Sequence, residues 1–506
     1  MGRFFNHLKL ALKPIAVLLL FIVQIAAIGG AYFLTEYLSD LGYDWATLIY
    51  VGLAFATFVL TVVFFLRVLY SREDAEFRIP WLLVLALLPG LGVVLYVIFR
   101  QRDLKRSQKK LLKNIQESYK PYFKSELHKE RLNDNYNEPI NFLESLSTFQ
   151  AHYDNKLEYY SCGEEWFPEF IEKLKTAKEF IFMEFFIIHE GKEWNQILDI
   201  LKQKAKEGVE VRLLYDDVGC ISTLPTTYAR KLRKIGIHAY RFNKVGLFIS
   251  GTYNNRSHRK IAVIDHKYGY TGGMNLGDEY ANDIKRFGYW KDTMIRIEGS
   301  AINNLIALFL TNYDLTVKQV SDYGKYLNYV YPKYESKSLI YPFGTGPENM
   351  YKVRVGDQNY VNLIECAMHT LYISSPYLIP STDILNSLQR AAYRGVDVKL
   401  FIPGIPDKKM VYKGAKFYML PLLEAGVKVY FYTPGFNHMK TLLADDMAAF
   451  VGTINLDYRS LVHHYECGAT IIDGDIMPKI RKDFENMESV STLVPRDYKL
   501  KKREKF

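Results

Sequence analysis

His258-Arg259-Lys260-Ile261-Ala262-Val263-Ile264-Asp265 and His438-Met439-Lys440-Thr441-Leu442-Leu443-Ala444-Asp445 are two copies of one pattern, H-x-K-x-x-x-x-D, placed 180 residues apart. In both copies six residues separate the aspartate from a glycine-led turn that ends in asparagine, Gly272–Asn275 and Gly452–Asn455. A single copy arises by chance in about a few per cent of chains of this length, but two copies with the same tail do not. The repeat therefore indicates a duplicated domain with one motif in each half.

The spacing inside each copy favours a β-strand. Alternate side chains of a strand share a face, so the histidine and the lysine two positions later point together into one pocket. The residues that follow, 261–264 and 441–444, are mostly apolar, as in a buried strand. The polar side chains then lie at strand ends, where sheet proteins commonly place their sites.

The same order of helices and strands recurs around both motifs. An amphipathic helix at residues 167–174 and a second helix ending near residue 206 alternate with apolar segments in the first half. Strands are expected at residues 180–188, 208–214 and 236–240, and again at 371–375, 395–400 and 426–430. Helix alternating with strand predicts an α/β layered fold with helices on the sheet faces.

Two histidines and two lysines in one pocket suit phosphoryl chemistry. A neutral imidazole is a competent nucleophile near pH 7, and a second imidazole can protonate a departing alkoxide, so His258 and His438 across a phosphorus suit in-line displacement. Lys260 and Lys440 can hold phosphate oxygens and stabilise the negative charge of the transition state. One active site between the two halves would explain the duplication, and neither half should work alone.

The remaining motif residues have supporting roles in this hypothesis. The amides of Asn275 and Asn455 add hydrogen-bond donors for phosphate, and Asp265 and Asp445 can fix the tautomer and orientation of the histidines. This arrangement needs no metal, and the sequence has none of the common metal-binding signatures. We therefore expect neither a metal nor another cofactor.

At these positions the sequence resembles the paired HKD motifs of the phospholipase D superfamily, and within it the bacterial cardiolipin synthases. The similarity covers essentially the whole chain, membrane segments included. It is carried by Asn255–Lys260, Gly272–Tyr280, Asn455–Ser460, Tyr215–Gly219 and Ser375–Tyr377. The resemblance implies a duplicated phospholipase D-like α/β/α sandwich behind an N-terminal helical membrane region, with lobes at residues 156–335 and 336–495.

The resemblance also implies roles for individual residues. His258 would be the nucleophile that forms a phosphatidyl-histidine, and His438 the acid that protonates the leaving glycerol and then the base for the acceptor hydroxyl. The two motifs alone are symmetric and do not decide which histidine attacks. Glu279 and Glu466 fall where the family has acidic residues, and they are possible site residues.

The implied function is that of a cardiolipin synthase, which transfers a phosphatidyl group from one phosphatidylglycerol to another through a phosphohistidine and releases glycerol. Motif spacing does not separate transfer from hydrolysis to phosphatidic acid, or from transfer to another acceptor alcohol. A nuclease is disfavoured because the chain carries membrane segments and no recognisable nucleic-acid-binding module. A non-enzymatic scaffold would need degenerate motifs, and both motifs are intact.

Charge and hydropathy point to a bacterial cell membrane. The net charge is +10, and the densest basic run follows a hydrophobic segment, where it would attract anionic lipids, including the phosphatidylglycerol substrate. The run consists of Arg100, Arg102, Lys105, Arg106, Lys109, Lys110 and Lys113. Four cysteines without framework spacing suit a reducing compartment. Oligomeric state is not readable from the sequence.

Residues 1–103 hold three stretches hydrophobic enough to enter a bilayer, Pro14–Leu34, Trp45–Leu66 and Ile79–Phe99. The positive-inside rule places the N-terminus, the second loop and the enzyme in the cytoplasm, which three full spans cannot achieve. The Pro89–Gly92 break makes the third stretch a candidate re-entrant hairpin or interfacial element. Alternatively, the first stretch lies in the interface. A basic juxtamembrane linker is expected at 104–155 and a basic tail at 496–506.

Overall fold

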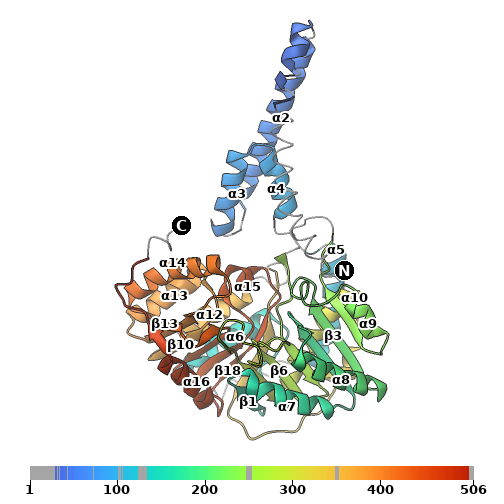
Figure 1. The fold of residues 1–506 in the computed structure, drawn as a ribbon, viewed down its shortest axis with the longest axis vertical. Coiled ribbons are helices and arrows are strands. Elements are labelled where there is room, and N and C mark those ends of the chain that lie inside the picture. Colours follow the sequence, from blue (N-terminus) through green and yellow to red (C-terminus); the bar gives the residue numbers. More distant parts are fainter. Residues whose placement is uncertain are drawn as a thin grey trace. The chain divides into compact units, whose positions relative to one another are not determined.

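The computed structural model describes residues 29–30, 32–33, 35–42, 44–71, 73, 75–100, 104, 106–123, 134–246, 254–347 and 353–500. The chain forms two compact units, a helical unit before Arg102 and an α/β unit that holds nearly all of the chain after it (Figure 1). The two large sheets of the larger unit are the duplicated α/β layers that the repeat predicts.

The helical unit contains one helix long and apolar enough to cross a membrane among the described residues, Thr47–Leu69. It is part of helix α2, Asp44–Leu69, which covers the second predicted hydrophobic stretch. Most of the first stretch, Pro14–Leu34, lies outside the described residues. The third stretch folds as two helices, α3 (Ala75–Leu87) and α4 (Leu91–Phe99).

The break between α3 and α4 has a clear physical basis. Gly90 has a positive φ of 78°, which favours glycine. Its N–H donates to the hydroxyl of Thr61 on α2 at 3.1 Å. A Cβ on Gly92 would lie 2.7 Å from the carbonyl oxygen of Val84, so α4 packs directly on α3. With 13 and 9 residues, neither helix reaches the roughly 20 residues that a span requires. The predicted interruption of the third stretch is confirmed.

The segment predicted as a basic linker is largely helical where the structure describes it. It contains α5 (Arg106–Tyr119), the 3-10 turn η1 (Lys120–Tyr122) and α6 (Asp134–Leu146). Helix α5 turns Leu112 and Ile115 inward and contacts the long helix α10 (Ile302–Val317), while its basic side chains remain exposed. The segment is therefore part of the α/β unit and not an extended tether.

The first sheet has the strand order β1-β8-β6-β5-β2-β3-β4. Its strands are β1 (Lys156–Tyr160), β2 (Phe180–Phe185), β3 (Glu210–Asp216), β4 (His238–Phe242), β5 (Ile261–Ile264), β6 (Tyr268–Gly272) and β8 (Met294–Glu298). Strands β2, β3 and β4 are parallel, whereas β5 pairs antiparallel with both β2 and β6. The first motif strand is thus the centre of a mixed sheet.

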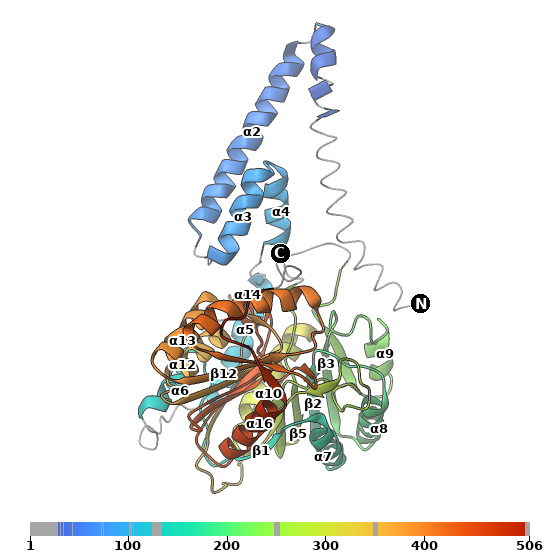
Figure 2. The ribbon, with the colours of Figure 1, turned by 60° about the vertical axis from the view of Figure 1, so that its left-hand side comes forward.

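Helices cover both faces of this sheet because the strands alternate their side chains. Ile181 and Met183 of β2 share a buried cluster with Phe170 of α7 (Gly163–Lys175) and Trp194 of α8 (Lys192–Lys206). On the opposite face Phe182 stacks on Phe309 of α10, with ring centroids 4.9 Å apart. Helices α7 and α8 also pack on each other (Figure 2).

The second sheet repeats this plan with the order β19-β13-β12-β10-β15-β16-β18-β9. Its strands are β9 (Leu339–Gly344), β10 (Thr370–Ser374), β12 (Asp397–Pro403), β13 (Lys428–Tyr432), β15 (Thr441–Ala444), β16 (Ala448–Gly452), β18 (Cys467–Ile472) and β19 (Ser491–Leu493). Its helices include α12 (Val355–Glu365), α13 (Thr382–Tyr393), α14 (Lys409–Ala425), α15 (Tyr458–Val462) and α16 (Met477–Ser489). The second motif strand, β15, is antiparallel between β10 and β16, as β5 is between β2 and β6.

Short elements complete the fold. They are α9 (Tyr228–Arg233), α11 (Tyr323–Leu327), β7 (Tyr289–Lys291), β11 (Leu378–Ile379), β14 (Gly435–Asn437) and β17 (Leu456–Asp457). Among them β7 and β14 form a parallel pair that joins the two halves of the α/β unit. This pair and the contacts of β6 with β16 and β18 hold the motif strands of the two halves close to each other.

Candidate active site

Each motif histidine is paired through its backbone to the other half of the unit. The N–H of His258 donates to the carbonyl of Tyr465 at 2.8 Å, next to a bridge between Ser257 and Tyr465. The N–H of His438 donates to the carbonyl of Lys291 at 2.7 Å, at the end of the β7–β14 pair. In both cases the accepting residue directly precedes an acidic residue.

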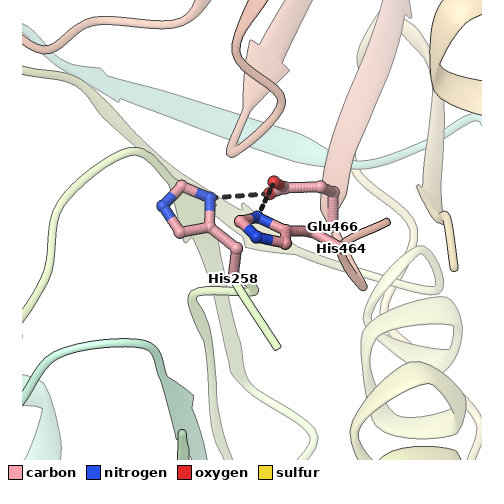
Figure 3. A group of neighbouring side chains, drawn as sticks. All are labelled: His258, His464 and Glu466. Atoms are coloured by element: carbon pink, nitrogen blue, oxygen red, sulfur yellow. Dashed lines mark hydrogen bonds and ion pairs between the residues drawn. The ribbon is translucent and has the colours of Figure 1, made fainter. Parts of the chain in front are cut away.

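Those two acidic residues hold the imidazole rings. Nδ1 of His258 lies 2.8 Å from Oε2 of Glu466 (Figure 3), and Nδ1 of His438 lies 2.5 Å from Oδ2 of Asp292. Both carboxylates are fully buried. We call these contacts the crossed pairs, because each joins a histidine of one half to a carboxylate of the other. With Nδ1 directed at a carboxylate, Nε2 is the nitrogen left for substrate.

The motif aspartates have a different role from the predicted one. Asp265 accepts hydrogen bonds from the backbone N–H groups of residues 178–180, at 2.8–3.0 Å. Asp445 does the same for residues 368–370 and also accepts from the hydroxyl of Tyr136. They stand at the far ends of β5 and β15, four residues of strand away from the motif lysines. The expectation that they orient the histidines is therefore wrong: they anchor loops.

The motif lysines lie beneath the histidines, and both are fully buried. Nζ of Lys260 donates to the carbonyl of His258 at 2.7 Å, and Nζ of Lys440 donates to that of His438. Burial lowers the pKa of Lys260 to about 7 and that of Lys440 to about 8. The negative charges of the nearby carboxylates oppose this lowering. A bound phosphate anion would add negative charge, so it would raise the pKa of both lysines and favour their charged form.

The two crossed pairs differ electrostatically. Burial lowers the pKa of His258 to about 3, which keeps its ring neutral. Burial alone would raise the pKa of Glu466, but the imidazoles of His258 and His464 hold it well below its usual range. Burial raises the pKa of Asp292 to about 6, against the lysine charges that lower it. The pKa of His438 is lowered by burial and by both lysines.

Both histidines open onto one cavity of about 670 Å³. Its wall combines the polar groups with an apolar surface. Among its lining residues are Phe186, His258, Asn275, Glu279, Tyr280, Trp290, Tyr377, Ile379, Lys408, Val411, Phe436, His438, Asn455 and His464. Thus the structure brings the predicted histidines and asparagines together, and Glu279 with them. Glu279 lies in this wall with His189 3.5 Å away.

The two asparagines are held unequally. Oδ1 of Asn275 accepts from the N–H of Ile187 at 3.0 Å, and its amide donates to the hydroxyl of Tyr280 at 2.7 Å. Oδ1 of Asn455 is buried and finds no hydrogen-bond partner within the described part of the chain. The first asparagine is fixed by the protein, whereas the second has capacity for a ligand.

Sequence reasoning did not identify Asp292 or His464. The constant offset of 180 residues places Glu466 opposite Arg286, not Asp292, so the repeat gives no signal for the second carboxylate. His464 lies two residues before Glu466, and its Nδ1 is 3.4 Å from Oε1 of that carboxylate (Figure 3). One ligand atom from each of His258, His464 and Glu466 lies within 4.8 Å of the others, a spacing that could also hold a cation.

Comparison with known proteins identifies the family of this chain. The family described as "Cardiolipin synthase, PLD-like domain" matches residues 170–304 and 360–488, and the one described as "Phospholipase D-nuclease N-terminal" matches residues 59–101. A cardiolipin synthase of Staphylococcus aureus is 35% identical over 462 residues, covering 86% of this chain and 90% of that protein. One from Alkalihalophilus pseudofirmus is 33% identical over 441 residues, covering 86% and 87%.

A solved structure supports the fold alone. The phosphatidylserine synthase of Haemophilus influenzae superposes with a TM-score of 0.55 at 16% identity, covering 72% of this chain and 92% of that one. The two segments that match the cardiolipin synthase domain, residues 170–304 and 360–488, fall on the two halves that supply the crossed pairs. The relatives extend over most of the chain. The chain therefore belongs to the cardiolipin synthases of the phospholipase D superfamily.

Proposed function

We propose that this phosphatidyltransferase moves the phosphatidyl group of one phosphatidylglycerol to a second phosphatidylglycerol, giving cardiolipin and glycerol. The observation that carries the proposal is the pair of histidines on one cavity, each held by a buried carboxylate from the opposite half and each with a buried lysine beside it. Such a site has a nucleophile, a proton donor and cationic groups for one phosphodiester.

The reaction takes place in two displacements. Nε2 of His258 attacks phosphorus, so the P–N bond forms while the P–O bond to glycerol breaks, and the glycerol oxygen takes a proton from His438. In the second step a hydroxyl of the other phosphatidylglycerol gives its proton to His438 and attacks phosphorus, and the P–N bond breaks. Lys260 and Lys440 balance the charge on the phosphoryl oxygens in both steps.

The difference between the crossed pairs supports His258 as the nucleophile. The pKa of Glu466 lies well below its usual range, so this carboxylate stays ionised and accepts a hydrogen bond from the Nδ1–H of a neutral His258. Burial raises the pKa of Asp292 to about 6, so the pair of Asp292 with His438 keeps an additional proton up to a pH nearer neutrality than the pair of Glu466 with His258 does. When two similar groups have different pKa values, the one that holds its proton is suited to act as the acid and the other as the base or nucleophile.

The cavity wall favours an alcohol over water as the acceptor. Its apolar side chains, among them Trp290 and Phe436, can pack on lipid and exclude solvent, and transfer needs a bound alcohol to outcompete concentrated water. Hydrolysis to phosphatidic acid and transfer to another alcohol are the competing outcomes.

The test is incubation of the purified, detergent-solubilised chain with labelled phosphatidylglycerol, followed by separation of the lipid products. We expect cardiolipin and glycerol from the wild type and neither from His258→Ala or His438→Ala. His238→Ala, a change at an exposed histidine on β4, is the matched control and should retain activity. Phosphatidic acid as the sole lipid product would make the chain a hydrolase, and no turnover would refute the proposed donor.

For location, we propose a multi-pass protein of the bacterial cell membrane with its α/β unit in the cytoplasm. Helix α2 and the basic residues that follow the hydrophobic stretches support this orientation. Protease added to right-side-out spheroplasts should leave the α/β unit intact and should digest it after lysis. Digestion in intact spheroplasts would place the unit outside.

A further inference from the structure

His464 is a buried imidazole at the active-site cavity, and its Nε2 has no hydrogen-bond partner among the described residues. It is 8% exposed, it lines the cavity, and its Nδ1 is directed at Oε1 of Glu466 at 3.4 Å (Figure 3), which leaves Nε2 for a ligand. Its backbone is fixed, because its N–H donates to the carbonyl of Arg459 at 3.1 Å and the next residue pairs with Arg256. The protein thus holds an unpaired ring nitrogen in a defined place.

A second unpaired group lies in the same wall. Asn455 is 4% exposed, and its Oδ1 has no partner within the described residues. Buried polar groups are normally hydrogen-bonded, so two of them in one cavity indicate a ligand that supplies the missing partners. The His464 ring centroid is 5.6 Å from that of the proposed nucleophile, His258, so this ligand group lies next to the phosphorus site.

The chemistry of the two groups selects a hydroxyl. With Nδ1 directed at the Glu466 carboxylate, Nε2 of the neutral His464 ring is an acceptor, and the amide oxygen of Asn455 is a second acceptor. Hydroxyl groups can donate to both, whereas a phosphoryl oxygen only accepts. A glycerol head group keeps two free hydroxyls besides the oxygen that bonds to phosphorus, one for each acceptor.

We infer that His464 and Asn455 form a hydroxyl-binding subsite that selects polyol head groups, such as glycerol, over alcohols that lack a second hydroxyl. The inference rests on the proposed function for its choice of glycerol. It makes His464 a determinant of specificity, because a site built to bind a hydroxyl discriminates strongly against an analogue without one.

The test compares two lipid donors, phosphatidylglycerol and phosphatidylethanol, whose head group has no free hydroxyl. Consumption of each donor is measured for the wild type, His464→Leu and His464→Asn, with EDTA present so that no cation bridges His258, His464 and Glu466. We expect the ratio of kcat/KM for phosphatidylglycerol to that for phosphatidylethanol to fall about 10- to 100-fold in His464→Leu. His464→Asn, which keeps a donor and an acceptor, should retain part of the preference.

Two results would overturn the subsite. An equal loss on both donors in His464→Leu would mean that His464 acts only through Glu466 and the nucleophile, and an unchanged ratio would mean that it contacts no head group. Because donor consumption is measured whatever the product, the test still works if the enzyme proves to be a hydrolase. Failure of the proposed transfer and failure of the subsite are therefore distinguishable.

An independent observation concerns the outer face of α14. Met410 is 77% exposed and Phe417 is 57% exposed, and they lie seven residues apart on one helical face with Lys413 between them. Lys409 is also exposed. At the start of this helix, Lys408 and Val411 line the active-site cavity. Apolar side chains interspersed with lysines are typical of a helix that lies in an anionic membrane interface.

We propose that this face of α14 docks on the anionic bilayer that holds the lipid substrate. An environment-sensitive fluorophore is attached at Met410→Cys or Phe417→Cys in the full chain with Cys162→Ser, in nanodiscs that hold one copy of the chain. In discs of phosphatidylcholine with phosphatidylglycerol, both labels should emit at shorter wavelength than a label at Val330→Cys, which is 92% exposed in the wild type. Emission equal to that of the Val330→Cys label would overturn the proposal.

Discussion

At the residue scale, the chemistry depends on two carboxylates that lie outside the repeated motif. Glu466 and Asp292 each accept from Nδ1 of a histidine that belongs to the other half, so each fixes a tautomer with Nε2 left for the substrate. Glu466 is itself held by the hydroxyls of Thr453 and Ser460. Its carboxylate therefore has a defined orientation before substrate arrives.

Replacement of Glu466 by glutamine should abolish most of the activity without unfolding the protein. The amide keeps the size of the side chain but loses the charge, and it can present an N–H to Nδ1, which would favour the wrong tautomer. A comparable change in a serine protease triad lowers kcat by about 10⁴-fold, and we expect a loss on the order of 10³- to 10⁴-fold here. The measurement is single-turnover formation of the phosphatidyl-enzyme. Wild-type rates in Glu466→Gln would contradict the role of the crossed pair.

Asp265→Asn should instead affect stability. Asparagine tolerates the positive φ of 51° at this position, but it loses the charge that accepts three backbone N–H groups. We expect a decrease of about 1–3 kcal/mol in the free energy of unfolding, with kcat retained by the folded enzyme. Thermal unfolding and initial rates measured on one preparation separate the two effects. A large loss of kcat at unchanged stability would restore a direct catalytic role for Asp265.

The pH dependence of kcat/KM should be bell-shaped. The pKa of Asp292 is raised to about 6, so below this pH it takes a proton and no longer accepts from His438. The pKa values of Lys260 and Lys440 are lowered to about 7 and about 8, so at higher pH these lysines lose the charge that binds phosphate. We therefore expect a maximum between about pH 6, the pKa of Asp292, and about pH 7, the pKa of Lys260.

Lys260→Arg is the variant that tests the alkaline limb. Arginine stays protonated over this range, so any residual activity of Lys260→Arg should decline at higher pH than the wild type. The exposed change Lys409→Arg is the control and should leave the profile in place. An unchanged alkaline limb in Lys260→Arg would show that another group titrates there.

At the element scale, local pattern predicted the strands well and the long-range pairing not at all. The apolar runs after Lys260 and Lys440 form β5 and β15. A short, continuous apolar segment between polar ends is typical of a strand that is buried on both faces. The crossed pairs depend on which backbone segment lies beside each histidine. For His438 that register is set by β7 and β14, and for His258 by the bridge between Ser257 and Tyr465. No periodicity within either half contains this information.

The membrane segments show the same division. The Pro89–Gly92 stretch predicted a break, but the Thr61 hydroxyl that accepts from the Gly90 N–H belongs to another helix. Helices α5 and α6 were missed as packed elements because their charged residues read as a linker, while a few buried side chains such as Ile115 carry the contacts. A narrow apolar stripe on a charged helix is recognised as a packing face only when the element that it packs against is known.

Thr61→Val should loosen the turn between α3 and α4. Valine has nearly the same shape but cannot accept from Gly90, so a buried amide loses its partner at a cost of about 1–3 kcal/mol. Hydrogen exchange of peptides covering residues 85–95, measured on the full chain in nanodiscs, should become faster. Thr47→Val, at the start of the apolar part of α2, is the control and should leave that exchange rate unchanged. Equal protection in Thr61→Val would mean that packing alone holds the turn.

At the scale of the α/β unit, the two halves form one catalytic site and not two. Each half supplies a histidine, a lysine and the carboxylate that orients the histidine of the other half. The sheets meet through β6, β16 and β18, and helix α10 of the first half also contacts β9 of the second. Separation of the halves would leave Glu466, Asp292 and both lysines without the groups that offset their burial.

Mixing experiments should show that this site forms within a single chain. If His258→Ala and His438→Ala chains are co-expressed and purified together through different tags, each copy contains one intact histidine and one defective site, because both crossed pairs close inside one chain. We therefore expect no recovery of cardiolipin formation above that of either variant alone. A tandem fusion of one wild-type copy to the double variant is the control for activity in the mixed assembly. Recovery to about a quarter or more of the wild-type rate would mean that the halves exchange between chains, as in domain swapping, and that the active site belongs to an oligomer.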